Sequence, residues 1–116
     1  MAIEITGRHV EVTESIREYA RKRLDRVARE FPRVDTIHMI LDVQRYLRIA
    51  EVIVHARRHI RLEAREESED MYASIDTVVD KIVKQLRRTV DKKNAHKAHA
   101  KPADVEREVE AAGEHD

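Results

Sequence analysis

The residues of this chain with the clearest chemical potential are cations that recur at helical spacing. Lys81, Lys84, Arg88 and Lys92 are separated by three, four and four residues, a spacing that places them in one row along a helix. We expect this row to face solvent, because the apolar residues of the same segment fall on the other side of the helix. A row of cations on a rigid helix can neutralise several phosphates of a nucleic acid together.

The simpler interpretation of such a row is a solvated face whose cations stabilise the C-terminal end of the helix. One or two cations in the last turn are enough for that purpose, whereas these begin more than two turns before the predicted end and continue beyond it. Phosphate binding is therefore the better explanation, with recognition of shape and backbone instead of bases. Against the single acid Asp91, residues 81–101 contain Lys81, Lys84, Arg87, Arg88, Lys92, Lys93, Lys97 and Lys101.

An earlier segment repeats the pattern. Lys22, Arg26, Arg29 and Arg33 are spaced four, three and four residues apart and form a second predicted row. Nearby acids at helical spacing can pair with these arginines, which weakens the second row taken alone.

The charge distribution decides whether a polyanion is a sensible partner. The chain of 116 residues has a formal net charge of zero, which by itself argues against nucleic-acid binding. Residues 102–116, however, contain six acids and one cation, so they contribute −5 and the remainder of the chain carries +5. The neutral total therefore combines a basic region with an acidic tail.

The elements that must position these cations follow from apolar periodicity. Alternation predicts strands and a recurrence every three or four residues predicts helices. Thr13 and Ser68 are the expected N-caps, Pro32 ends the first helix, and Arg45 and Tyr46 form the turn of a hairpin. We predict strands at residues 3–7, 35–44, 47–56 and 59–66, and helices at about 14–31 and 69–93.

The resulting order, β-α-β-β-β-α, indicates the α+β class. Two amphipathic helices each need a partner for one apolar face, and a four-stranded sheet with one solvated face provides it. The helices are therefore expected to pack on one face of the sheet. We assign residues 1–95 to a single domain and residues 96–116 to a mobile tail that is acidic from residue 102.

Other chemistries have little support. Cysteine is absent and only two glycines are present, which excludes thiolate sites and phosphate-cradling glycine loops. His55 with His59, or His96 with His99, have spacings that could bind a metal, but incidental exposed histidines are the better interpretation. We expect no enzyme activity, no cofactor and no metal. The absence of an apolar span or signal peptide predicts a cytoplasmic protein without a membrane partner.

Two segments resemble the ribosome hibernation promoting factor family, also called the protein Y or ribosome-associated inhibitor family. They are "EESEDMYASIDTVVDKIVKQLRR", residues 66–88, and "IEITGRHVEVTESIREYARKRLDRV", residues 3–27. The resemblance covers about residues 1–95 and is that of a short member. It implies a fold akin to a double-stranded RNA-binding domain. One departure is Arg57-Arg58-His59, where many members turn with an Asn-Gly type pair; this turn is shaped differently or adds a phosphate contact.

The resemblance implies a monomeric translation inhibitor that binds the small ribosomal subunit and the whole ribosome through rRNA and takes no small-molecule substrate. It would occupy the channel used by messenger and transfer RNA. The acidic tail resembles that of members that oppose ribosome pairing; competition with RNA or simple solubilisation are the alternatives. A freestanding double-stranded RNA-binding module remains the other functional reading. The predicted RNA-binding residues are Arg8, Lys22, Arg23, Arg26, Arg29, Lys81, Lys84, Arg87, Arg88 and Lys92.

Overall fold

The computed structural model of this protein describes residues 2–98, with side chains up to Thr89. The chain divides after Val83 into two units, and each is described by itself. The first unit contains β1 (Ala2–Arg8), α1 (Glu14–Glu30), β2 (Val34–Gln44), β3 (Leu47–Ala56), β4 (Ile60–Ser68) and the first part of α2 (Met71–Ala98). The second unit begins at Lys84. The predicted element order is confirmed, and residues 99–116, most of the expected tail, lie outside the described residues.

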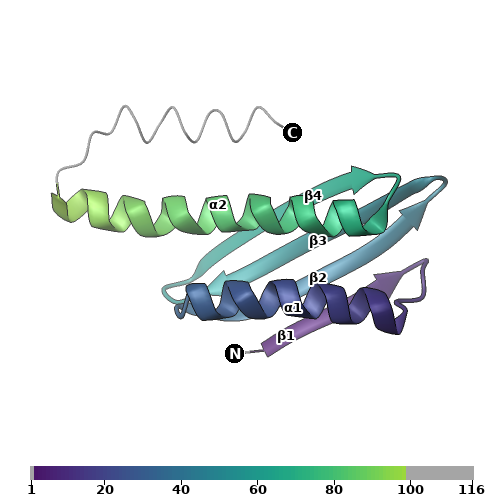
Figure 1. Cartoon of the computed structure of the whole chain (residues 1–116). Helices are drawn as coiled ribbons and strands as arrows, with labels where there is room; N and C mark the ends of the chain where they lie inside the picture. The colour runs from purple at the N-terminus through teal and green to yellow at the C-terminus, as the bar shows by residue number, and fades with distance from the viewer. Residues whose placement is uncertain (1, 99–116) are drawn as a thin grey trace. The chain divides into compact units, whose positions relative to one another are not determined.

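The four strands form one sheet in the order β1-β2-β3-β4. β1 pairs with β2 in parallel, and α1 makes the connection between them. β2, β3 and β4 form an antiparallel meander. Figure 1 shows α1 and the start of α2 on the same face of the sheet, so the predicted α+β arrangement is confirmed.

The core lies between this sheet face and the helices. Along β2, Ile37, Met39 and Leu41 are almost fully buried, and the alternation continues onto β3 at Val52 and Val54. The helices supply the opposing apolar residues, which on burial contribute about 1.5–3 kcal/mol for each large side chain. From the first unit these are Ala20, Leu24 and Val27 of α1 and Met71, Ile75, Val78, Val79 and Ile82 of α2.

The ends of α1 follow its sequence signals. Thr13 is the N-cap, and its Oγ1 accepts a hydrogen bond from the Ile16 amide at 3.2 Å. At the other end, the Phe31 amide donates to the Val27 carbonyl at 2.9 Å and Pro32 follows the helix. The helix thus ends at Glu30, one residue before the predicted boundary, and Arg33 does not belong to it.

The start of α2 differs from the prediction, because the helix begins at Met71 and Ser68 is not its N-cap. Asp70 takes that role, and its Oδ1 accepts a hydrogen bond from the Tyr72 amide at 3.2 Å. The Ser68 hydroxyl instead accepts from the Asp70 amide at 3.2 Å and lies 2.6 Å from the Ser74 hydroxyl. Ser68 therefore stabilises the turn that positions Asp70 as the N-cap of α2.

Candidate nucleic-acid interface

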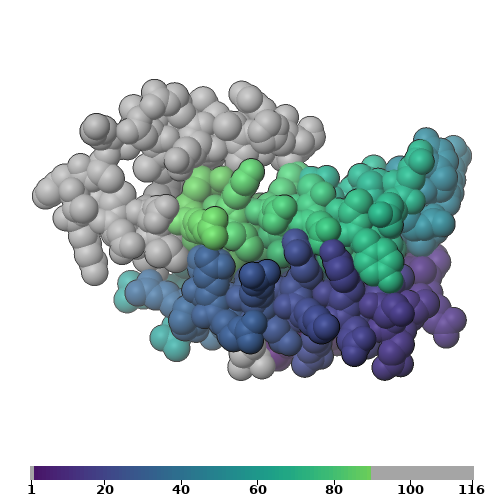
Figure 2. Space-filling view, in the orientation of Figure 1, coloured from purple at the N-terminus to yellow at the C-terminus, as the bar shows by residue number. Residues whose placement is uncertain are grey.

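The exposed cations of α1 lie on the surface of the first unit that faces away from the sheet. Lys22, Arg26 and Arg29 are all exposed, while Leu24 and Val27 point into the core. The helix periodicity predicted this separation. Figure 2 shows α1 and the start of α2 side by side on this outer surface. Among the side chains that the structure describes, these three cations form no ion pair with an acid.

Arg23, also predicted to bind RNA, has a different environment. Its Nε lies 3.2 Å from Asp76 Oδ1 and its Nη2 lies 3.9 Å from Asp80 Oδ1, both on α2, and its side chain is 30% exposed. Asp76 Oδ1 also accepts a hydrogen bond from the Tyr19 hydroxyl at 2.6 Å. Arg23 therefore joins the two helices, and its charge is already partly neutralised.

Tyr19 completes this contact between the helices. Its ring meets that of Tyr72 edge-on, with ring centroids 4.9 Å apart and an interplanar angle of 87°, a favourable aromatic geometry. Its hydrogen bond to Asp76, with a smaller effect of burial, raises the pKa of the Tyr19 phenol above its usual value of 10.0. This cluster sets the spacing between α1 and the start of α2.

Lys81 was predicted to face solvent, but its side chain is half-buried. Its Nζ lies 2.7 Å from Glu66 Oε2 on β4, and both side chains are 22% exposed. The cause is its position on the flank of the helix, next to the buried Ile82, where Glu66 on the helix-covered face of β4 can reach it. Lys81 therefore ties α2 to the sheet.

In the second unit the cations differ in exposure. Lys84 and Arg87 are exposed and Arg88 is half-buried. Lys92 lies in α2, but its side chain is outside the described residues. The helix extends to Ala98, about five residues beyond the predicted end, so the cations of the predicted row are on one helical backbone.

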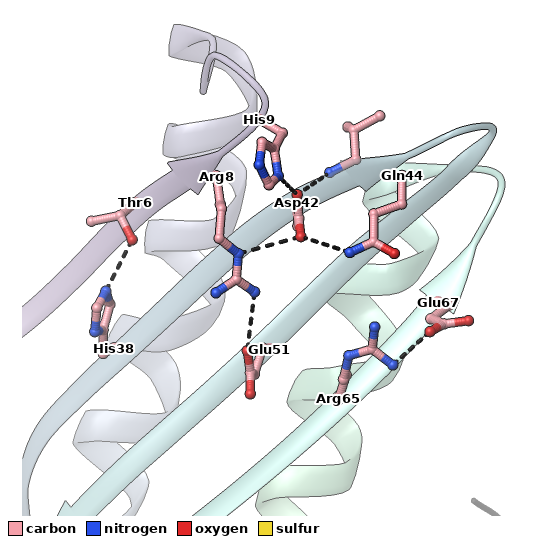
Figure 3. Close-up of polar contacts among 10 residues, drawn as sticks. Thr6, Arg8, His9, His38, Asp42, Gln44, Glu51, Arg65 and Glu67 are labelled. Carbon is pink, nitrogen blue, oxygen red and sulfur yellow. Dashed lines mark hydrogen bonds and ion pairs between the residues drawn. The ribbon is translucent and has the colours of Figure 1, made fainter.

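Arg8 lies on the opposite face of the sheet from the helices. Its Nε is 3.3 Å from Asp42 Oδ2 and its Nη2 is 3.6 Å from Glu51 Oε1. Figure 3 shows Arg8, His9 and Gln44 converging on Asp42, with Arg8 also reaching Glu51. Arg8 is therefore separated from the exposed cations of α1 and engaged by two carboxylates.

Asp42 is the buried centre of this polar group, with an exposed fraction of 1%. Burial alone raises the pKa of a carboxyl group. Here the pKa of Asp42 is nevertheless held below its usual 3.8, because hydrogen bonds from His9, the Val43 amide, Arg8 and Gln44 outweigh that burial. The polar group stabilises the end of β1 against β2, and its signal in the sequence was the lone acid in the apolar run of residues 37–43.

The described residues also bear on the metal sites and membrane spans considered from the sequence. Among the described residues, no group of three or more potential ligands could hold a metal ion. His55 and His59 are exposed, whereas the pair of His96 and His99 falls outside the described side chains. Within the same part of the chain, no helix is long and apolar enough to cross a membrane.

Sequence comparison identifies relatives over most of the chain. The family model described as Sigma 54 modulation protein / S30EA ribosomal protein matches residues 3–94. The ribosome hibernation promoting factor of Salmonella typhimurium is 33% identical over 96 residues, which are 83% of this chain and 100% of that protein. The factor of the same name from Azotobacter vinelandii is 31% identical over 104 residues, 90% of this chain and 96% of that protein.

Two solved structures resemble the fold. A ribosomal subunit interface protein from Coxiella burnetii aligns with a TM-score of 0.72 and 28% identity, covering 78% of this chain and 99% of the other. The N-terminal domain of Thermus thermophilus Protein Y aligns with a TM-score of 0.68 and 31% identity, covering 77% and 99%. These similarities confirm both the predicted fold and the predicted family resemblance.

Proposed function

Because the chain belongs to the Sigma 54 modulation protein / S30EA ribosomal protein family, we propose that it is a ribosome-associated hibernation factor that acts in the cytoplasm. Its relatives carry the name ribosome hibernation promoting factor. We further propose that it binds the small subunit through rRNA and occupies the channel of messenger and transfer RNA. Inhibition would then be steric and would need no catalytic turnover.

The observation that carries this proposal is the separation of the basic residues into two groups. Arg8, Arg23 and Lys81 are engaged by carboxylates of the protein. Lys22, Arg26 and Arg29 on α1 are exposed, as is Lys84 on α2. Exposed cations on rigid helices can meet RNA phosphates with little loss of side-chain pairing inside the protein. Their binding releases counterions, so affinity should fall steeply with salt.

Co-sedimentation with purified ribosomes on sucrose gradients tests the proposal. Wild-type protein is expected on small subunits and whole ribosomes, and Lys22→Ala with Arg26→Ala should move it toward the top of the gradient. Arg61→Ala with Arg65→Ala is the matched control, because it removes the same charge from the solvated sheet face. Absence of the wild-type protein from all ribosomal fractions at moderate salt would contradict the proposal. Equal affinity for isolated duplex RNA would favour a freestanding RNA-binding module instead.

A further inference from the structure

The first unit contains a second group of exposed cations at one end of the sheet. Arg33, predicted to continue the row of α1, lies instead in the connection to β2. The Arg57 amide donates a hydrogen bond to the Arg33 carbonyl at 3.0 Å, and Val34 pairs with Ala56. Residues 24 positions apart in the sequence are thus brought together. In Figure 1 the turn between β3 and β4 lies beside the C-terminal end of α1.

The turn itself has an unusual backbone for its residues. Arg58 and His59 have φ values of 67° and 63°, and neither is a glycine. Ala56 pairs with Ile60, so Arg57, Arg58 and His59 form a three-residue loop, and two of these residues have a backbone conformation in which glycine or asparagine is preferred. Left-handed backbone is unfavourable for long side chains. Arg45 at the β2–β3 turn has the same left-handed backbone, with a φ of 58°, so the case for the β3–β4 turn rests on the cations gathered around it.

The charge balance at this end of the unit is positive. Arg33, Arg57, Arg58 and His59 are all exposed, and Arg29 is exposed near the end of α1. The acids next to them in the sequence are Glu30 and Asp35. The four arginines therefore exceed the carboxylates even when His59 is neutral, unlike the group around Arg8, where two carboxylates hold one arginine.

We propose that Arg33, Arg57, Arg58 and His59 form a second RNA-binding surface, the turn surface, which takes backbone phosphates of rRNA. It rests on the proposed function and extends it. The basic surface of α1 does not stop at Arg29 but continues around the helix end onto the β3–β4 turn. Arginine suits this role because its planar fork binds two phosphate oxygens at once.

A pair of glycine substitutions tests the turn surface without unfolding the protein. Arg58→Gly removes one cation from a residue with positive φ and supplies the residue type that this backbone prefers. Arg45→Gly does the same at the β2–β3 turn, where φ is 58°, and is the matched control. Affinity for purified ribosomes is measured for both variants over a series of salt concentrations, with thermal melting as the check on folding.

Arg58→Gly is expected to melt no lower than wild type and to bind about fivefold to tenfold more weakly at 0.1 M salt, roughly the loss of one phosphate contact. The slope of log affinity against log salt should fall by about 0.7 to 0.9, while Arg45→Gly leaves both the affinity and this slope unchanged.

Wild-type affinity and slope in Arg58→Gly would overturn the turn surface and leave the proposed function standing. Equal weakening by Arg45→Gly would also overturn it. Failure of wild type to bind ribosomes would refute the proposed function itself and this extension with it.

Discussion

Arg23 of α1 and Asp76 of α2 form an ion pair at 3.2 Å, and the same carboxylate oxygen accepts the Tyr19 hydroxyl at 2.6 Å. Removal of the Asp76 carboxylate leaves the Tyr19 hydroxyl without its acceptor and the half-buried Arg23 without its ion-pair partner, which is costly for a charged group. We expect Asp76→Ala to lower the free energy of unfolding by about 1–2 kcal/mol. Urea denaturation measures this loss.

Asp80→Ala is the matched control for that experiment. Asp80 lies 3.9 Å from Arg23, with its side chain 71% exposed, and exposed pairs of this kind contribute about 0–1 kcal/mol. Equal destabilisation by the two variants would show that the contact between Arg23 and Asp76 has no special role.

Lys81 and Lys84 are expected to respond in opposite ways to the same substitution. Lys81→Ala breaks the contact with Glu66 and should cost about 0.5–1 kcal/mol of stability. Lys84→Ala should stay within about 0.5 kcal/mol of wild type and lose ribosome affinity. Denaturation and co-sedimentation of both variants are compared side by side. A stability loss in Lys84→Ala alone would contradict the assignment of Lys81 to the contact with Glu66 and of Lys84 to ribosome binding.

Asp42 predicts a specific dependence of stability on pH. Its pKa is lower in the folded protein than the usual 3.8, so its ionised form stabilises the fold above that value and this contribution is lost as pH falls toward the folded pKa. Asp42→Asn should therefore melt below wild type at pH 7, and the difference should narrow once pH falls below 3.8. A constant difference in melting temperature from pH 7 to pH 3 would contradict this linkage.

Gly7 is required by a close approach of the chain. A Cβ added there would lie 2.3 Å from the Val10 carbonyl oxygen and 2.9 Å from Val12 Cγ2. Backbone cannot yield as a flexible side chain does, so Gly7→Ala should destabilise the fold by about 1–3 kcal/mol. Thermal melting is the measurement, and a wild-type melting temperature would mean that the segment after β1 relaxes freely.

The elements were predictable from the sequence because each obeys one dominant periodicity. The β2–β3 hairpin shows this clearly: Gln44 pairs with Leu47, which leaves Arg45 and Tyr46 as the turn, as predicted. The start of α2 was less predictable, because Ser68 and Asp70 are both good caps. In the folded protein the Ser68 hydroxyl lies next to the Ser74 hydroxyl, which donates to the Arg48 carbonyl at 2.6 Å. Ser68 is thus engaged by these tertiary contacts, and Asp70 caps the helix.

The site was predictable in its residue types and only partly in its geometry. Helical projection distinguishes a buried side from an exposed side, and it placed Lys22, Arg26 and Lys84 correctly. It has no information on acids from other strands and helices, so the partners of Arg23 and Lys81 were missed. The proximity of Arg33 to Arg57 depends on strand register, which no local pattern contains.

β4 forms one edge of the sheet, and an open edge can recruit a strand from another molecule. Its solvated face carries Arg61 paired with Glu63 at 2.8 Å and Arg65 paired with Glu67 at 2.5 Å. Charged side chains along an edge discourage edge-to-edge association. A sheet extended by a second copy would have to place these four charges against another chain. We therefore expect β4 to resist aggregation at high protein concentration, even though most of the β3 residues with which it pairs are apolar.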